Sequence, residues 1–177
     1  MKAGEESLKD TELKLLSELM KDSSRSHREL AKVLGISQPT VSRMVSRLEK
    51  AGVIKEYTMI PDLRKLGIEI IAFTFGVWVP EMLKSYSEGA RIEKAKKFIS
   101  KHPNVIFASS GRGLGMGRMI LTVHKDYSDY NEFMKQTENE WAGLLTKLES
   151  FTVSVNTDAV TMPFSLRNLM EYIRKTE

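Results

Sequence analysis

The stretch SQPTVSRMVSRLEKAG, residues 37–52, constrains the fold of this chain more than any other part of it. Ser37 is a preferred residue at a helix N-cap, and Pro39 falls in the first helical turn, where a missing backbone N–H costs nothing. Gly52 is placed to end the helix in a left-handed conformation. Apolar residues recur within the stretch at three- and four-residue spacing and predict one buried stripe, formed by Val41, Met44, Val45 and Leu48.

The other side of this predicted helix combines short hydroxyl side chains with cations and carries no acid. Its residues are Thr40, Ser42, Arg43, Ser46, Arg47 and Lys50. Such a face can donate to phosphates and to base edges, and it suits the major groove of DNA. The alternative is an ordinary amphipathic helix whose polar face contacts only water.

The preceding residues favour the nucleic-acid interpretation. Ser26 and Glu29 have the spacing of a capping box, which opens a short helix that ends at Gly35. We expect the apolar residues of that helix to point inward: Leu30, Val33 and Leu34. Two short helices joined by a tight turn containing Gly match a helix-turn-helix. A helix from Asp10 or Thr11 to about Asp22 would complete a three-helix core.

Residues 53–60 alternate in the manner of a β-strand, so we expect a wing after the third helix. The predicted DNA-contacting residues are Arg25, Arg28, Ser37, Gln38, Thr40, Ser42, Arg43, Ser46, Arg47, Lys50 and Lys55. Within this set Arg43 and Arg47 are the expected base or phosphate contacts. Arg25 and Arg28 have an equally simple alternative as solvated charges of a polar loop.

Charge and composition limit the class of protein. The formal net charge of +4 permits a nucleic-acid partner without requiring one. The chain has no cysteine, so disulfides and thiolate metal sites are excluded. Its longest apolar run, residues 68–80, is interrupted by Glu69 and is shorter than the roughly 20 residues that a membrane helix needs. We therefore expect a soluble cytoplasmic protein with no membrane partner.

The second half predicts a ferredoxin-like βαββαβ unit with helices on one face of an antiparallel sheet. Strands are expected at residues 68–79, 104–110, 118–124 and 151–160, and a loop at residues 82–89. Helices are expected at residues 90–102 and from Asp126 or Ser128 to about Leu148. We expect the sheet face away from the helices to carry Ile70, Ala72, Ile120, Thr122 and Ser154. That face is too apolar to remain exposed to solvent, which favours dimerisation through the two sheets.

Glycines alternate at positions 111, 113, 115 and 117 between the two middle strands. A dinucleotide site needs G-x-G-x-x-G between a strand and a helix, and here a strand follows. The segment is either a hairpin without a ligand or an anion site, for which the candidate residues are Gly111, Arg112, Gly113 and Arg118. We expect no catalytic residues, no metal and no cofactor, because the three histidines lack metal-ligand spacing and His124 suits a polar strand edge.

The run ELAKVLGISQPTVSRMVSRLEKAGVIKEYTMI, residues 29–60, resembles the DNA-binding domain of the Lrp/AsnC (leucine-responsive, feast/famine) regulators. The second half is similar to the effector-binding and oligomerisation domain of the same family. The resemblance implies a sequence-specific transcriptional regulator of double-stranded DNA, working as a homodimer or an assembly of dimers. It also implies a small-molecule effector at the glycine hairpin. That loop often carries acids in the family, and here it carries arginines, so the expected effector is an anion or carboxylate.

Sirohaem decarboxylases look like the same two-domain architecture and supply the alternative, an enzyme acting on a polycarboxylate tetrapyrrole. In that case Arg112, Arg118 and His124 would hold the substrate. We favour the regulator, because a scaffold helix has no need of an acid-free cationic face. The expected domains are 1–62 (winged helix-turn-helix), 63–67 (connector), 68–161 (ferredoxin-like domain) and 162–177 (C-terminal helix, packed on a neighbour or on the DNA-binding half).

Overall fold

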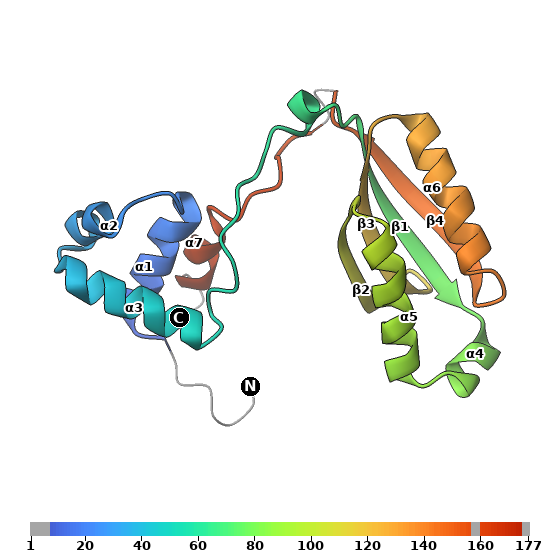
Figure 1. Ribbon diagram of the computed structural model, residues 1–177, viewed down its shortest axis with the longest axis horizontal. Coiled ribbons are helices and arrows are strands. Elements are labelled where there is room, and N and C mark those ends of the chain that lie inside the picture. Colours follow the sequence, from blue (N-terminus) through green and yellow to red (C-terminus); the bar gives the residue numbers. More distant parts are fainter. Residues whose placement is uncertain (1–7, 157–159, 175–177) are drawn as a thin grey trace. The chain divides into compact units, whose positions relative to one another are not determined.

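The computed structural model describes residues 8–156 and 160–174, and it divides into two compact units (Figure 1). The first unit combines the described residues up to Ile60 with those from Pro163 onward, and the second runs from Pro61 to Met162. The chain therefore passes from one unit to the other and back. Within the described residues, every helix is too short or too polar to cross a bilayer.

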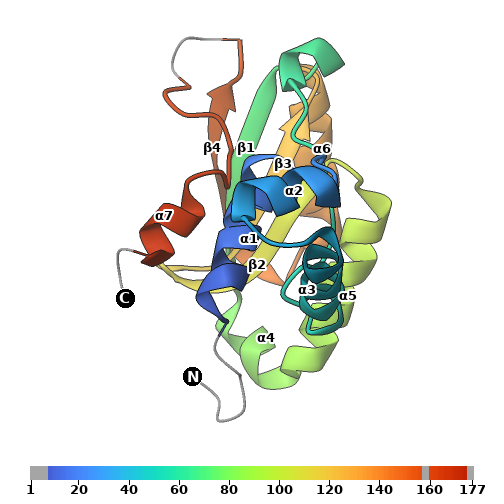
Figure 2. The same ribbon diagram turned by 90° about the vertical axis from the view of Figure 1, so that its left-hand side faces the viewer.

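The first unit is a small helical bundle. It contains α1 (Asp10–Lys21), α2 (His27–Leu34), α3 (Gln38–Lys50) and, from the far end of the chain, α7 (Leu169–Arg174). Leu15, Leu30 and Val41 are completely buried at its centre. The short α7 lies beside α1, as both ribbon views show (Figures 1 and 2). Met170 of α7 is buried. The C-terminal helix thus packs on the first unit of its own chain.

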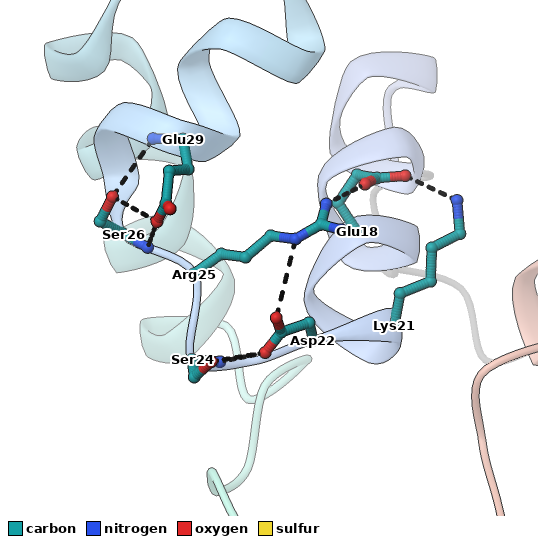
Figure 3. Close-up of polar contacts among 7 residues, drawn as sticks. All are labelled: Glu18, Lys21, Asp22, Ser24, Arg25, Ser26 and Glu29. Carbon is teal, nitrogen blue, oxygen red and sulfur yellow. Dashed lines mark hydrogen bonds and ion pairs between the residues drawn. The ribbon is translucent and has the colours of Figure 1, made fainter.

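Local chemistry fixes the turn between α2 and α3. The backbone N–H of Glu29 donates to Ser26 Oγ at 3.3 Å, and the Glu29 carboxylate accepts from the Ser26 backbone at 2.7 Å, which confirms the capping box (Figure 3). Gly35 ends α2 with φ of +67°, a conformation that favours glycine. Ser37 then caps α3 by accepting from the backbone of Thr40 at 3.3 Å. These residues set the angle at which α3 leaves the turn.

The expected inward position of Val33 is wrong, because this side chain is 57% exposed. The eight residues of α2 bury only Leu30 and Ala31, with Leu34 partly buried against the same core. A two-turn helix has room for one narrow stripe, and Val33 falls beside it.

The strand expected at residues 53–60 is also wrong, since these residues form no strand in the structure. Ile54 packs against the core of the first unit, and the residues after it run as irregular, exposed chain. A strand requires a paired neighbour for its backbone hydrogen bonds, and no described segment pairs with this one. Residues 53–60 do alternate as a strand does, but alternation alone cannot form a strand without a neighbouring strand.

The second unit has the ferredoxin-like arrangement that the sequence predicted. Its elements in order are η1 (Leu63–Leu66), β1 (Ile70–Trp78), α4 (Pro80–Ser85), α5 (Glu88–Lys101), β2 (Val105–Gly113), β3 (Met116–His124), α6 (Tyr127–Glu140) and β4 (Leu145–Ser154). The strands are antiparallel in the order β2-β3-β1-β4. Figure 1 shows α5 and α6 against the sheet. Phe98, Phe133 and Trp141 of this helix layer form a core with Ile120 and Leu145 of the sheet.

The two faces of the sheet are the reverse of the expected ones. Ile70, Ala72 and Thr122 are buried, and Ile120 packs against α5 and α6, so this set faces the helices. The alternate residues Ile71, Phe73 and Phe75 belong to the face without helices. Alternation correctly divides the residues of β1 between the two faces of the sheet. It does not show which face the helices cover, because both faces of β1 are apolar.

Several element boundaries differ from the expected ones. Part of the expected loop at 82–89 is the helix α4, and α5 begins at Glu88. The helix α6 ends at Glu140, and β4 begins at Leu145, earlier than expected. The pairing of β4 with β1 is irregular opposite Val77 and Trp78. As a result, Leu145 and Leu148 lie on the same face of the sheet although they are three residues apart. A three-residue spacing is typical of a helix, which explains the wrong prediction. Residues 157–159 of the expected last strand lie outside the described residues.

Candidate nucleic-acid interface

The helix α3 presents a cationic face to solvent. Val41, Val45 and Leu48 hold its inner side in the core of the first unit. On the outer side Gln38, Ser42, Arg43, Arg47 and Lys50 are exposed, and Thr40 and Ser46 are half-buried. Arg43, Ser46, Arg47, Lys50 and Ala51 line an open hollow along this face. The structure therefore brings most of the predicted DNA-contacting residues together on one helix.

Arg47 also has a partner inside the unit. Its Nε lies 3.2 Å from Oε1 of Glu12 on α1, and its Nη2 donates to Oε2 at 3.2 Å. The Glu12 side chain is only 3% exposed, whereas that of Arg47 is 42% exposed. Arg47 thus neutralises a buried carboxylate with one side of its guanidinium and reaches the surface with the rest. Among the described residues, the side chain of Arg43 donates one hydrogen bond, to the carbonyl of Pro39 within its own helix at 3.4 Å.

Arg25 is held in an ion-pair network at the junction of α1 and α2 (Figure 3). Its guanidinium contacts the carboxylate of Glu18 and lies 3.9 Å from that of Asp22. Hydrogen bonds from Lys21 and then from Arg25 lower the pKa of Glu18, so this carboxylate stays charged. Arg28, by contrast, is exposed at the start of α2. Arg25 is therefore a structural brace whose surface-facing side remains available, and Arg28 is open to a partner.

The remaining predicted contacts lie at the two ends of α3. The Ser37 and Thr40 hydroxyls are 2.8 Å apart at its amino end, where Ser37 also acts as the cap. Lys55 is exposed in the irregular segment beyond the carboxyl end. There the phenol of Tyr57 donates to the Glu49 carboxylate at 3.1 Å, and burial raises the pKa of Tyr57. The expectation of an acid-free face on α3 is therefore wrong, because Glu49 is exposed there and is hydrogen-bonded to a tyrosine.

The glycine segment is a tight hairpin. β2 and β3 are joined at Leu114 and Gly115, which both have positive φ, +53° and +71°. This pair of left-handed residues suits a two-residue turn with right-handed strand twist. Gly111, Arg112 and Gly113 are exposed at the end of β2.

Arg118 is the cross-strand partner of Ser110, beside that exposed end, and it is half-buried. Its guanidinium carbon is 5.0 Å from the ring centre of Trp78 and 4.7 Å from that of Trp141. Burial, with a smaller contribution from the charge of Arg91, lowers the pKa of Arg118. Of the four predicted effector residues, three lie together on the hairpin and Arg118 reaches the helix layer.

His124 is completely buried, so the expectation of a polar strand-edge residue is wrong. Its Nε2 lies 2.8 Å from the Thr122 hydroxyl, and its Nδ1 lies 3.5 Å from Oδ2 of Asp129. Burial lowers the pKa of His124, opposed by Asp129. His124 and Arg118 stand near opposite ends of β3. Within the described chain no cluster of histidines and acids could hold a metal ion.

Sequence patterns missed several residues around these sites. Glu12 looks like an ordinary residue of the first turn, and its burial follows only from the packing of α1 on α3. Trp78, Arg91, Lys94 and Trp141 also went unnoticed, because they come from separate elements and meet only in the folded unit. The two tryptophans, at the ends of β1 and α6, were the signal that could have identified them.

Comparison with known proteins places the first unit in a family of DNA-binding domains. A family model described as winged helix-turn-helix DNA-binding matches residues 8–55. An HTH-type transcriptional regulator of Pyrococcus furiosus, PF2053, is 42% identical over 113 residues, which cover 64% of this chain and 68% of that protein. The transcriptional regulator AzlB of Bacillus subtilis is 31% identical over 130 residues, covering 72% and 76%. LrpC of Bacillus subtilis is 33% identical over 100 residues, covering 56% of this chain and 63% of LrpC.

Solved structures of transcriptional regulators align with most of the chain. An AsnC family transcriptional regulator from Agrobacterium tumefaciens aligns with a TM-score of 0.70 at 21% identity, over 90% of this chain and 97% of that one. The regulator NMB0573 of Neisseria meningitidis, solved as a complex with L-Met, aligns with a TM-score of 0.71 at 19% identity, over 92% and 99%. These likenesses confirm the fold of the chain.

Proposed function

The chain belongs to the Lrp/AsnC family of DNA-binding transcriptional regulators, and from this premise we propose that α3 enters the major groove of its operator. Arg43 is the residue assigned to a base edge, with Gln38 and Ser42 beside it. Lys50, Arg28 and Lys55 are assigned to backbone phosphates, which position the helix without reading sequence. Arg47 contacts phosphate with the part of its guanidinium that Glu12 leaves exposed.

The observation that carries this proposal is the outer face of α3. It is exposed, cationic and rigidly held, because the inner face is buried in the core and the amino end is capped by Ser37. Its single exposed acid, Glu49, is already bonded to Tyr57. A helix presented in this way at the end of a tight turn offers donors to a groove without a competing carboxylate.

The first prediction concerns Arg43. Selection of bound fragments from a pool of random duplexes supplies the probe, and mobility shift at fixed salt then gives the affinity. Arg43→Ala should lose about 1–3 kcal/mol of binding free energy on the selected duplex if it pairs with a guanine, and should lose specificity at that base pair. The matched control Lys14→Ala removes one cation from the exposed side of α1 and should change little.

Two outcomes would revise this assignment. If Arg43→Ala weakens binding equally on all duplexes, Arg43 contacts phosphate and another residue reads the base. If the folded wild-type protein retains no duplex at low ionic strength, α3 does not bind DNA and the proposal fails.

Dimerisation through the open face of the sheet is the second part of the proposal. Phe107, Leu121, Phe73 and Phe151 form a row of partners across the four strands on this face. Phe107 is 49% exposed and Phe151 is 67% exposed in the single chain. A contiguous apolar face of this kind suits a two-fold contact with a second copy, which would present two α3 helices to one operator.

We further propose that a small anionic effector acts on the second unit. The support is the pair of arginines, Arg112 and Arg118, near a hairpin that contains no acid. The neighbour from Neisseria meningitidis was solved with L-Met, which makes a small-molecule effector a reasonable expectation for this fold. The enzyme alternative has no comparable support, since PF2053, AzlB and LrpC are all named as transcriptional regulators and His124 is buried far along β3 from Arg118.

A further inference from the structure

Cations converge on two indole rings in the second unit, forming what we call the tryptophan–arginine cluster: Trp78, Arg91, Lys94, Arg118 and Trp141. Arg118 lies 5.0 Å and 4.7 Å from the centres of the two rings. The guanidinium of Arg91 lies 5.8 Å from the ring centre of Trp78, and Nζ of Lys94 lies 5.4 Å from that of Trp141. The two rings meet edge to face at 5.9 Å. The cluster joins the carboxyl end of β1, the start of β3, α5 and the end of α6.

No carboxylate neutralises these cations within the described part of the chain. Glu93 is paired with Lys96 at 2.8 Å, and Glu140 is paired with Lys101 at 3.0 Å. Arg91 donates to the backbone carbonyl of Tyr86, a neutral partner. Among the described residues, neither arginine nor Lys94 forms an ion pair with an acid.

Stacking on aromatic rings accounts for only part of this arrangement. One arginine on a tryptophan is an ordinary cation–π contact, worth about 0.5–2 kcal/mol. It does not explain why further cations approach the same rings, since like charges at close range repel and are costly to desolvate together. Burial is the main cause of the lowered pKa of Arg118, and the charge of Arg91 adds a smaller contribution. An anion bound among the three side chains would remove the repulsion between them.

The space beside the cluster limits the size of that anion. A cavity of about 30 Å³ lies between the sheet and the helices, and Arg118 and Trp141 form part of its wall with Thr74, Phe98 and Ile99. This volume holds about one water molecule, far less than an amino-acid side chain. The cavity therefore cannot take the body of a ligand, so a bound acid would place only its carboxylate among the half-buried side chains of Arg91, Lys94 and Arg118.

We propose that Arg91, Lys94 and Arg118 bind the carboxylate group of a small organic acid against Trp78 and Trp141. Guanidinium groups hold carboxylates through paired N–H donors, and the two indole rings hold the cations in place. The proposal deepens the effector part of the proposed function and rests on it only for the regulatory role. It moves the ligand from the exposed hairpin to the helix layer, so Arg112 becomes dispensable for binding.

Intrinsic fluorescence tests the proposal directly, because the chain has two tryptophans and both lie in the cluster. Acetate, benzoate and inorganic phosphate are titrated separately into the folded full-length protein at constant ionic strength. Benzoate or acetate should change the fluorescence saturably. Arg118→Met keeps an aliphatic stem on the rings while removing the charge, and should weaken carboxylate binding about tenfold or more.

Two further variants keep the proposal testable if Arg118→Met fails to fold. Arg91→Ala and Lys94→Ala change half-exposed positions and should also weaken binding, with circular dichroism confirming the fold. Arg112→Ala tests the hairpin as the alternative position of the carboxylate and should leave binding unchanged if the ligand lies in the cluster. The matched control is Arg64→Ala, which removes an exposed arginine outside both the hairpin and the cluster and should leave binding unchanged. A response lost in Arg112→Ala and kept in Arg118→Met would overturn the proposal. So would saturation by phosphate alone, or no saturable response to either carboxylate.

DNA binding separates this inference from the proposed function. If the folded protein retains its selected duplex but gives no carboxylate response, only the cluster assignment fails. If the carboxylate binds while no duplex is retained, the site stands and the DNA-binding proposal fails.

Discussion

At the scale of single residues, the buried ring of His124 makes the second unit sensitive to acid. Burial lowers its pKa below the ordinary 6.5, so the unfolded chain takes up a proton at a higher pH than the native one. The contribution of His124 to the stability of the second unit is therefore fully present above pH 6.5. It is lost as the pH falls from 6.5 toward the lower pKa of the native state. We expect the free energy of unfolding of the second unit, followed by tryptophan fluorescence in urea, to decrease between about pH 7 and pH 5.

His124→Gln keeps a group that can hydrogen-bond Thr122 and removes the titration, so its stability should vary less over the same range. His102→Gln is the matched control, because it removes a half-exposed histidine and leaves His124 in place. In this control the free energy of unfolding should still decrease at low pH. Equal acid loss in wild type and His124→Gln would show that another group is responsible.

At the scale of elements, the ion pair between Glu12 and Arg47 joins α1 to α3. Removing the cation leaves a carboxylate that is 3% exposed without its charge partner. We expect Arg47→Met to lower the free energy of unfolding of the first unit by about 1–3 kcal/mol, since the surface side of the pair is screened by water. Helical circular dichroism in urea measures it. Arg43→Met, on the same helix without an acidic partner, should change stability by less than about 0.5 kcal/mol.

A double variant tests the mechanism of that loss. Glu12→Gln preserves the bond to the Lys9 backbone that closes the first turn of α1 and removes the negative charge. Adding it to Arg47→Met should restore part of the stability, because no buried charge remains unpaired. Additive losses in the double variant would mean that Arg47 stabilises the unit by packing alone.

Local sequence signals predicted the elements around α3 because their causes are local. The capping box of Ser26 and Glu29, the left-handed Gly35 and the stripe of Val41, Val45 and Leu48 act within a few residues of chain. Residues 53–60 failed for the opposite reason, since a strand depends on a partner elsewhere. The salt bridge of Arg47 likewise depends on a residue 35 positions away, which no spacing on α3 could reveal.

The contrast between local causes and distant partners also explains which features of the second unit the sequence predicted. The order of strands and helices followed from periodicity, but the side of the sheet that the helices cover did not, because Ile70 and Ile71 are equally apolar neighbours. The tryptophan–arginine cluster draws on four elements, so the sequence identified only Arg118. The predicted DNA-contacting residues of α3 lie on one exposed helix face, where a helical pattern is sufficient to collect them.

At the scale of the whole molecule, the open sheet face decides whether one chain can act alone. Phe151 is the cross-strand partner of Phe73, and both lie on the face away from α5 and α6. If two copies pack through this face, each symmetric dimer buries Phe151 twice. Phe151→Glu would bury two carboxylates without partners, so we expect the dimer dissociation constant to rise about a hundredfold or more, measured by sedimentation equilibrium. Phe164→Glu, at an exposed phenylalanine of the first unit, should leave it unchanged. A Phe151→Glu protein that dimerises like wild type would place the interface elsewhere, and the spacing of two α3 helices would then need another explanation.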